Sequence, residues 1–201
     1  MSTTTERHEL TLAKAQFGEK ILGSKEFRGE LYILVEKDAI CEVLEFFKED
    51  ARLSYDYFAE CVGVDYSVWT HARDFSHPKR FEVVYNLMNY RTGGRIFFKV
   101  TVDDGEPIRS AKDIFTGAEY PEREIQDLFG IEFTGNPEPK GMRFMLPDDW
   151  IGYPLRKEYP LGGEDVVFDK GTLGPAVEDV SLPHAGESFE GKTGSSDQSG
   201  R

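Results

Sequence analysis

The clearest periodic stretch of the chain begins at Ile40. Val43, Leu44 and Phe47 follow it at i+3, i+4 and i+7, with charged residues between them, which is the pattern of an amphipathic helix. Asp38 stands just before this stretch and is the expected N-cap, because its carboxylate can accept hydrogen bonds from the free amides of a first turn. The pattern predicts a helix with one buried face.

Other helical signals are shorter. Apolar residues interspersed among polar ones predict a short helix over 8–22. Another helix is predicted over Pro121–Phe129, because proline fits the first turn of a helix and Gly130 follows where a left-handed C-terminal cap favours glycine. Ser110–Phe115 is expected to form a helical turn, and residues 53–66 a turn that runs into a short extended piece.

Three segments have the character of strands. Phe27–Glu36 is rich in β-branched and aromatic residues. Arg80–Tyr90 and Arg95–Val102 follow later, and the Arg-Thr-Gly-Gly link between them has turn chemistry, so they are expected to form an antiparallel hairpin. The predicted fold is α+β, with a mixed or antiparallel sheet covered by helices.

The pattern changes after Gly135. Prolines interleaved with glycines and aromatics exclude long helices and central strands, yet the segment is too apolar to be a flexible linker. We therefore expect an α+β domain over 1–134 and an extended, irregular, partner-binding arm over 135–165. Residues 166–201 form a polar tail that cannot bury enough apolar surface to order itself.

Charge limits the partners. The formal net charge is −13, because 37 acidic residues outnumber 24 basic ones, and this argues against nucleic acid or an anionic membrane surface as a direct partner. The longest apolar runs, such as Leu31–Val35, are about a quarter of a spanning helix. The start of the chain also lacks a signal peptide's order of basic and then apolar residues. A soluble protein on the cytosolic side is expected.

Metal and thiol chemistry has little support. Cys41 and Cys61 stand far apart without a CxxC motif, which cannot build an iron–sulfur cluster or a thiolate zinc site from this chain alone. Both are expected to be buried thiols. The four histidines are His8, His71, His77 and His184. His71 and His77 flank a polar loop at a spacing of six, which suits shared ligation neither on a helix nor on a strand face, and they are interpreted as loop residues.

One motif match lacks its context. Gly186, Gly191, Lys192 and Thr193 satisfy the phosphate-loop pattern GxxxxGK[ST], but that loop works only between a strand and a helix. The few residues after Thr193 are glycine, serine and other polar types, so a stand-alone nucleotide-binding protein is the weak alternative. The chain contains no GxGxxG after a strand, no GxSxG and no HExxH, and its adjacent acidic residues are best explained as solvated turn carboxylates.

Two segments are more specific. Residues 122–131 read EREIQDLFGI and residues 146–159 read LPDDWIGYPLRKEY. Together they resemble the C-subunit family of respiratory NADH:quinone oxidoreductase (complex I), in the order of that family and at nearly its spacing. The likeness extends from Phe27 to about Leu161. It departs at Asn136, where the family commonly has histidine.

The resemblance implies a non-catalytic, structural subunit without cofactors, since FMN and the iron–sulfur clusters belong to partner subunits. It further implies packing on the D subunit, which lines the quinone pocket, with the B and I subunits as neighbours, on the cytoplasmic side of the bacterial inner membrane. The alternative is the equivalent subunit of a ferredoxin- or F420H2-driven quinone oxidoreductase or of a membrane-bound hydrogenase.

The two segments also supply the candidate interface residues. In the helix, Arg123 and Asp127 are expected to pair at i,i+4, while Glu122 and Glu124 point to different sides. Arg156 offers a planar fork suited to a carboxylate in an interface, so Arg156→Ala should weaken assembly more than it lowers the melting point of the isolated subunit. The full set is Glu122, Arg123, Glu124, Asp127, Leu128, Phe129, Trp150, Pro154, Leu155, Arg156 and Lys157.

Overall fold

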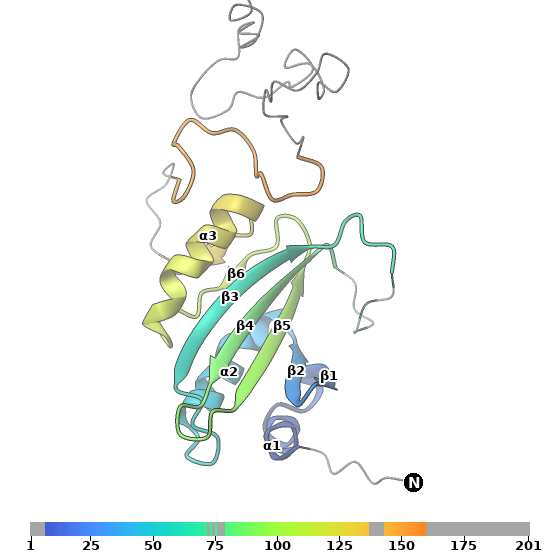
Figure 1. The fold of residues 1–201 in the computed structure, drawn as a ribbon, viewed down its shortest axis with the longest axis vertical. Coiled ribbons are helices and arrows are strands. Elements are labelled where there is room, and N and C mark those ends of the chain that lie inside the picture. The colour runs from blue at the N-terminus through green and yellow to red at the C-terminus, as the bar shows by residue number, and fades with distance from the viewer. Residues whose placement is uncertain (1–6, 72, 74, 76–78, 137–142, 160–201) are drawn as a thin grey trace, which may run out of the picture.

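The computed structural model describes residues 7–71, 73, 75, 79–136 and 143–159 (Figure 1). The α-helices are α1 (His8–Phe17), α2 (Ile40–Glu49) and α3 (Glu119–Phe129). The strands are β1 (Ile21–Phe27), β2 (Glu30–Val35), β3 (Tyr57–Asp65), β4 (Phe81–Met88), β5 (Arg95–Val102), β6 (Ile108–Arg109) and β7 (Phe133–Thr134). Short 3₁₀ helices are η1 (Gly18–Lys20), η2 (Lys37–Ala39) and η3 (Thr116–Ala118).

The main sheet has the strand order β1-β2-β5-β4-β3. Strands β2 and β5 are parallel and every other neighbouring pair is antiparallel, so the sheet is mixed. Strands β6 and β7 form a small parallel pair beside it. The expected α+β class and the β4–β5 hairpin are both confirmed.

The helices gather on one face of the main sheet. In Figure 1, α2 lies behind the strands, and its Phe47 packs edge-on against Phe98 of β5 at a ring separation of 4.8 Å. Helix α1 joins α2 through the rings of Phe17 and Phe46. Helix α3 runs along β3, where a Cβ on Gly63 would meet side chains of α3 at 3.1 Å. The hydrophobic core therefore lies between this face and the helices.

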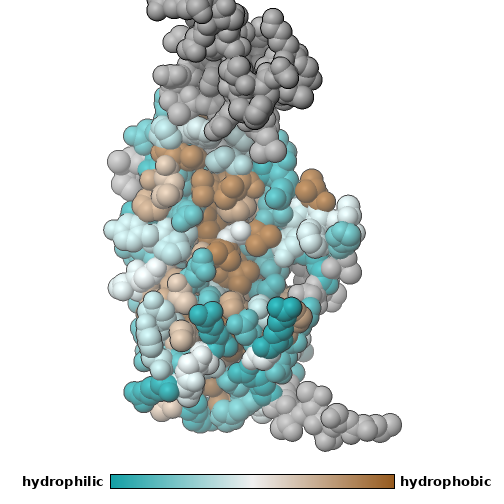
Figure 2. Space-filling view, in the orientation of Figure 1, coloured by the Kyte–Doolittle hydropathy of each residue, from teal (hydrophilic) through white to brown (hydrophobic). Residues whose placement is uncertain are grey.

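The opposite side, which we call the outer face of the sheet, carries no helix within the described chain (Figure 1). It is formed by alternate strand residues such as Tyr32, Phe97, Val84 and Val62, which are partly or largely exposed. Figure 2, in the same orientation, shows hydrophobic surface on this side of the molecule. A two-layer arrangement thus leaves half-covered apolar side chains on the sheet.

Several boundaries differ from the prediction. Helix α1 ends at Phe17, and the rest of the predicted 8–22 helix is η1 and the start of β1. Residues 57–65 form a full strand where a turn and a short extended piece were expected, because pairing with β4 overrides their weak, bulge-interrupted alternation. The segment predicted as strand Phe27–Glu36 contains the β1–β2 turn and β2.

The expected N-cap at Asp38 is wrong. Helix α2 spans Ile40–Glu49 as predicted, but η2 precedes it and puts Ala39 at the cap position, without a side-chain cap hydrogen bond. The amide of Ala39 bonds instead to the carbonyl oxygen of Glu36. Asp38 lies within η2 and is exposed, so the chain enters the helix through a tighter backbone turn.

Candidate subunit interface at the end of helix α3

Helix α3 ends as its sequence predicts. Gly130 adopts a left-handed conformation (φ 73°, ψ 27°), and its amide donates to the carbonyl oxygen of Gln126. The last carbonyls of a helix have no partner inside it, and here three consecutive ones accept from the arm. The bonds are Arg143 Nη1 to Asp127 O (3.1 Å), Leu155 N to Leu128 O (3.1 Å) and Arg156 Nε to Phe129 O (2.7 Å).

Asp127 is the first anchor of the arm. Its side chain is almost completely buried, and Oδ2 accepts hydrogen bonds from the amides of Phe144 (3.2 Å), Met145 (2.7 Å) and Leu146 (2.9 Å). Oδ1 lies 3.1 Å from Nη1 of Arg143. A carboxylate that accepts several amide bonds and one guanidinium contact is well compensated for its burial, so this residue fixes the first part of the arm.

Arg143 then folds the arm on itself. Its Nη2 donates to the carbonyl oxygens of Trp150 (2.9 Å) and Gly152 (3.0 Å), and its guanidinium lies over the ring of Tyr153 at 5.3 Å. One cation thus joins α3 to two points of the arm, which gives an irregular segment a defined path (Figure 1).

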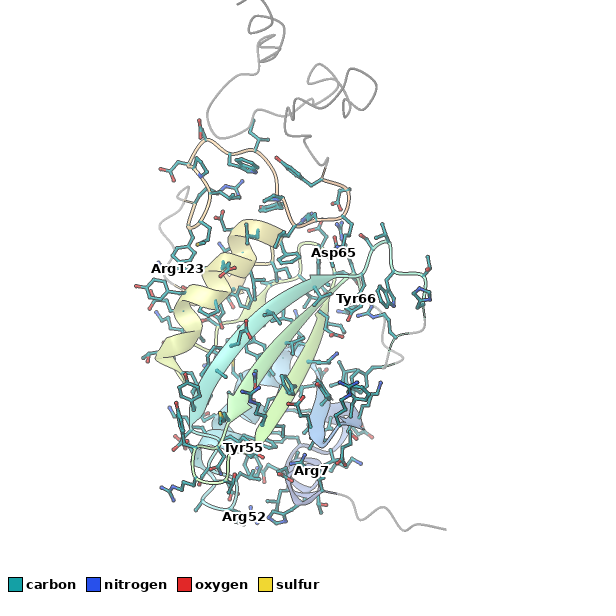
Figure 3. The ribbon with its side chains drawn as sticks, in the orientation of Figure 1. Arg7, Arg52, Tyr55, Asp65, Tyr66 and Arg123 are labelled. Atoms are coloured by element: carbon teal, nitrogen blue, oxygen red, sulfur yellow. The ribbon has the colours of Figure 1, made fainter. Side chains whose placement is uncertain are left out.

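Asp65, at the end of β3, is the second anchor (Figure 3). Its Oδ2 accepts from the amide of Lys157 (3.0 Å) and from Nη2 of Arg80 (3.0 Å), while Oδ1 accepts from the amide of Ser67 (2.9 Å). Burial alone would raise the pKa of Asp65, but these hydrogen bonds outweigh it and hold the pKa well below its usual range. Arg80 also pairs with Glu158.

Arg156 lies between the two anchors. Its guanidinium makes two hydrogen bonds to Asp104, at 2.9 and 2.7 Å, and lowers the pKa of that carboxyl. It also stacks over the rings of Phe81 (5.2 Å) and Tyr153 (4.6 Å). The side chain that the sequence assigned to a partner carboxylate therefore contacts a carboxylate of its own chain.

Glu122 is enclosed within the domain. Its carboxyl accepts from the Ser110 hydroxyl, the Ala111 amide (2.8 Å) and Nδ2 of Asn136 (3.1 Å). Burial raises the pKa of Glu122 against these hydrogen bonds. Asn136, the position where the sequence departs from its family, thus helps to hold the buried carboxyl of the first signature segment. Glu124 is exposed, so the two acids do point to different sides.

The predicted pair of Arg123 with Asp127 is not formed. Arg123 lies 3.0 Å from Glu119 at i,i−4, and its Nε donates to Asn136 Oδ1, while Asp127 is taken by the arm. The arrangement follows from the position of Asp127 at the buried end of α3, where several donors outcompete one local cation. Figure 3 places Arg123 on α3, away from the arm's second anchor.

Several apolar side chains of this region point outward. Met145 and Ile151 are 60% and 54% exposed, Leu155 is 46% exposed, and Tyr120 is exposed while stacked on Phe144 at 5.6 Å. Figure 2 shows hydrophobic surface over α3 and the arm. Because hydrogen bonds to α3 and β3 hold the backbone of the arm, its apolar side chains Met145, Ile151 and Leu155 are kept exposed in an ordered segment.

The candidate residues fall into three groups. Glu122 and Asp127 are buried, whereas Glu124, Leu155 and Lys157 are exposed. Those of intermediate exposure are Arg123, Leu128, Phe129, Trp150, Pro154 and Arg156. The structure brings the two signature segments together, mostly with each other, and whether they also contact a partner stays a prediction.

The sequence interpretation missed Asp65, Arg80, Asp104 and Arg143. All four act through contacts between segments that are distant in the chain, and none has a periodic signal. Cys41 and Cys61 are both buried and free, as expected, and burial raises the pKa of the Cys41 thiol to about 11.

Within the described ranges, no group of His, Cys, Asp and Glu could hold a metal ion. No helix of that same part of the chain has the length and apolarity needed to cross a membrane. The phosphate-loop match at 186–193 and the end of the arm at 160–165 lie outside the described residues.

Two solved structures share the fold. One, titled Nqo5 of the trypsin-resistant fragment, matches with a TM-score of 0.55 and 28% identity over 65% of this chain and 96% of that chain. The other is the membrane-bound sulfane sulfur reductase, an archaeal respiratory membrane complex, with a TM-score of 0.54 and 24% identity over 70% and 76% of the chains; that likeness concerns the fold alone. The class is thus that of Nqo5-like α+β proteins.

The model of the family described as respiratory-chain NADH dehydrogenase, 30 Kd subunit, matches residues 33–165, and the chain belongs to this family. The C subunit of NADH-quinone oxidoreductase from Roseiflexus sp. (strain RS-1) is 41% identical over 77% of this chain and 84% of that protein. Its counterpart in Citrifermentans bemidjiense is 37% identical over 80% and 92%. The resemblance expected from the two signature segments is confirmed.

Proposed function

We propose that this chain is a non-catalytic, structural subunit of proton-translocating NADH:quinone oxidoreductase that packs on the D subunit, which lines the quinone pocket. The B and I subunits are its neighbours in the assembly. The curated relatives, which are NADH-quinone oxidoreductase subunits, support the choice of complex. The second candidate is the equivalent subunit of a ferredoxin- or F420H2-driven quinone oxidoreductase or of a membrane-bound hydrogenase. The fold that this chain shares with the archaeal respiratory membrane complex supports this candidate.

One observation carries the structural role. The arm is fastened to its own domain at Asp127 and Asp65, yet it holds Met145, Ile151 and Leu155 outward. A preordered apolar surface loses little conformational entropy on binding, and single exposed apolar residues become an interface signal only when they cluster on one surface. The arm surface, which we define by these three residues, is the proposed contact with the D subunit.

The chain itself would supply no redox chemistry. FMN and the iron–sulfur clusters are assigned to partner subunits, because the buried carboxyls of Glu122 and Asp127 hold the domain and the arm together and Cys41 and Cys61 stand far apart in the sequence. We place the chain on the cytoplasmic side of the bacterial inner membrane, bound there through the complex.

The test is recovery of the assembly with a chain tagged at its N-terminus, after mild detergent extraction of native membranes. Recovery of flavin, iron–sulfur absorbance and NADH:quinone activity supports the proposal. Recovery of a similar complex without NADH-binding subunits identifies the chain as the equivalent subunit of the second candidate. A tagged chain that is recovered alone overturns both proposals.

The arm surface is tested by Met145→Asp combined with Leu155→Asp. We expect at least a tenfold drop in recovered assembly and little change in the melting temperature of the isolated chain. Val68→Asp, which also replaces an exposed apolar residue but lies beyond β3, is the matched control. An unchanged yield for the double variant contradicts the assignment of this surface.

A further inference from the structure

A second surface lies at the other end of the molecule, on the outer face of the sheet. Strands β1, β2 and β5 contribute alternate residues there, since Lys25 pairs with Tyr32 and Tyr32 with Phe97 in the strand register. Arg95 begins β5, whereas Asp104, which binds the arm, follows its end, so a whole strand separates the two surfaces. We call this surface the basic-aromatic corner; its residues are Lys25, Phe27, Arg28, Tyr32, Arg95 and Phe97.

The aromatic part of the corner is preorganised. The rings of Tyr32 and Phe97 are stacked at 4.7 Å with an interplanar angle of 10°, and the Tyr32 hydroxyl donates to Glu30 at 3.0 Å. Phe27 is 51% exposed, and its ring lies under Lys25 Nζ (5.7 Å) and the Arg28 guanidinium (5.1 Å). Phe27 is thus exposed, while Tyr32 and Phe97 are partly buried; accessible aromatics held in one orientation are enriched at binding surfaces.

The charge of the corner contrasts with that of the chain. Arg28 and Arg95 form no ion pair with any residue that the structure describes, although acidic residues outnumber basic ones by 37 to 24 overall. Arg80, Arg143 and Arg156 are all paired with carboxylates. Arg28 lies over the exposed ring of Phe27, and Arg95 is exposed two residues before Phe97 in β5, so both guanidinium groups are available to carboxylates from another molecule.

Arg28 also occupies a strained backbone position. It has φ of +53° and precedes Gly29 at +82° in the two-residue β1–β2 turn. Such turns favour Asn or Asp followed by Gly, and a long side chain with positive φ is uncommon. An arginine here holds its guanidinium over the exposed ring of Phe27, which the residues favoured by the turn could not do.

We propose that the basic-aromatic corner docks an acidic segment of another protein subunit, with carboxylates on Arg28 and Arg95 and an apolar or planar side chain on Phe27 and Phe97. A phosphate backbone is a poorer occupant, because a chain of net charge −13 repels it and Glu30 lies inside the corner. A second copy would bring like charges together in a symmetric contact.

The corner is tested by replacing Phe27, whose ring is exposed, with a photoreactive phenylalanine analogue in the tagged chain, irradiating native membranes and sequencing the crosslinked peptide. The expected product joins position 27 to an acidic segment of a different subunit. Crosslinks to a second copy, to the tail of the same chain, to nucleic acid or to lipid alone, or no crosslink, overturn the proposal. The crosslink reports contact at the corner alone, whereas the arm surface is tested by Met145→Asp combined with Leu155→Asp, so the two proposals can fail separately.

Charge reversal supplies the second measurement. Arg28→Glu with Arg95→Glu is expected to reduce recovery of the crosslinked partner by about tenfold, and reversal of the partner's carboxylate to lysine should restore it. Arg91→Glu, an exposed arginine in the β4–β5 loop, is the matched control and keeps wild-type recovery. Equal losses for Arg91→Glu, or no rescue, would show that only overall charge matters and would overturn the specific contact.

Discussion

Arg156 closes the end of α3: its Nε donates to the carbonyl oxygen of Phe129 at 2.7 Å, while its other nitrogens bind Asp104. A residue of the second signature segment thus satisfies a backbone group of the first. A cation at the C-terminus of a helix also interacts favourably with the helix dipole. The two segments form one structural unit within the chain before any partner binds.

Arg156→Ala is therefore expected to destabilise the isolated chain by about 1–2 kcal/mol, measured by urea denaturation. The Asp104 part of the loss is small because that carboxylate is half exposed. The expectation drawn from the sequence is that Arg156→Ala weakens assembly more than it lowers the melting point of the isolated subunit, whereas the contacts within the chain predict a clear loss of stability as well. An unchanged unfolding midpoint together with lost assembly would favour the interface role that the sequence indicates.

Asp127→Asn tests the first anchor. The amide side chain keeps one acceptor oxygen but loses the charge that meets Arg143, so we expect a loss of about 1–3 kcal/mol. Hydrogen exchange at the amides of Phe144, Met145 and Leu146 should accelerate by more than tenfold. Asp149→Asn, an exposed position of the same arm, is the control and should leave those rates unchanged.

Gly130→Ala separates backbone strain from a steric clash. Its positive φ alone predicts a loss of about 1 kcal/mol, and the added Cβ would lie 2.5 Å from the ring of Tyr153 and 2.8 Å from Arg156. Gly135→Ala is the matched control, because Gly135 also has positive φ but no atom within 4 Å. Gly130→Ala should therefore be clearly the worse of the two in thermal denaturation; equal losses would mean that Tyr153 moves aside freely.

The buried carboxyl of Glu122 gives a pH dependence of defined sign. Burial raises its pKa in the folded state, so the folded chain retains the proton that the unfolded chain releases above its ordinary value of 4.5. The stabilisation by Glu122 is complete below that value and is lost as pH rises through the folded pKa.

Glu122→Gln should therefore lose less stability than the wild type between pH 5 and pH 8. The comparison needs unfolding free energies of both proteins at each pH. Glu124→Gln, on the exposed side of the same helix, should follow the wild type. A Glu122→Gln variant that follows it too would mean that Glu122 is ionised throughout the range.

Much of the fold is readable from local pattern. The α2 face, the β4–β5 hairpin and the Gly130 cap follow from periodicity and turn chemistry. Strand β1 and most of β3 were not found, because both are edge strands whose alternation is weak and interrupted by irregularities at 21–23 and 58–60. Their conformation is decided by pairing with a neighbouring strand.

The site was predictable in part. Both signature segments were recognised, but their contact depends on backbone amides that donate to Asp127 and Asp65. Nearly every residue has a backbone amide, so the sequence does not indicate which amides bind these carboxylates. Arg123 illustrates the limit: a local i,i+4 rule favours Asp127, whereas the folded chain offers that carboxylate to donors from 143–146.

The arm is bonded to the domain through the amides of Leu146 and Lys157, and the residues between them form a loop over the end of α3. Lengthening such a loop costs little free energy, since doubling a loop raises its closure free energy by only about 0.6 kcal/mol. Insertions near Ile151 would change the contacts of Arg143 with Trp150 and Gly152 and alter how far the chain reaches, while the bonds at Leu146 and Lys157 stay in place. The same body could thereby be fitted to differently shaped neighbours through changes in loop length alone.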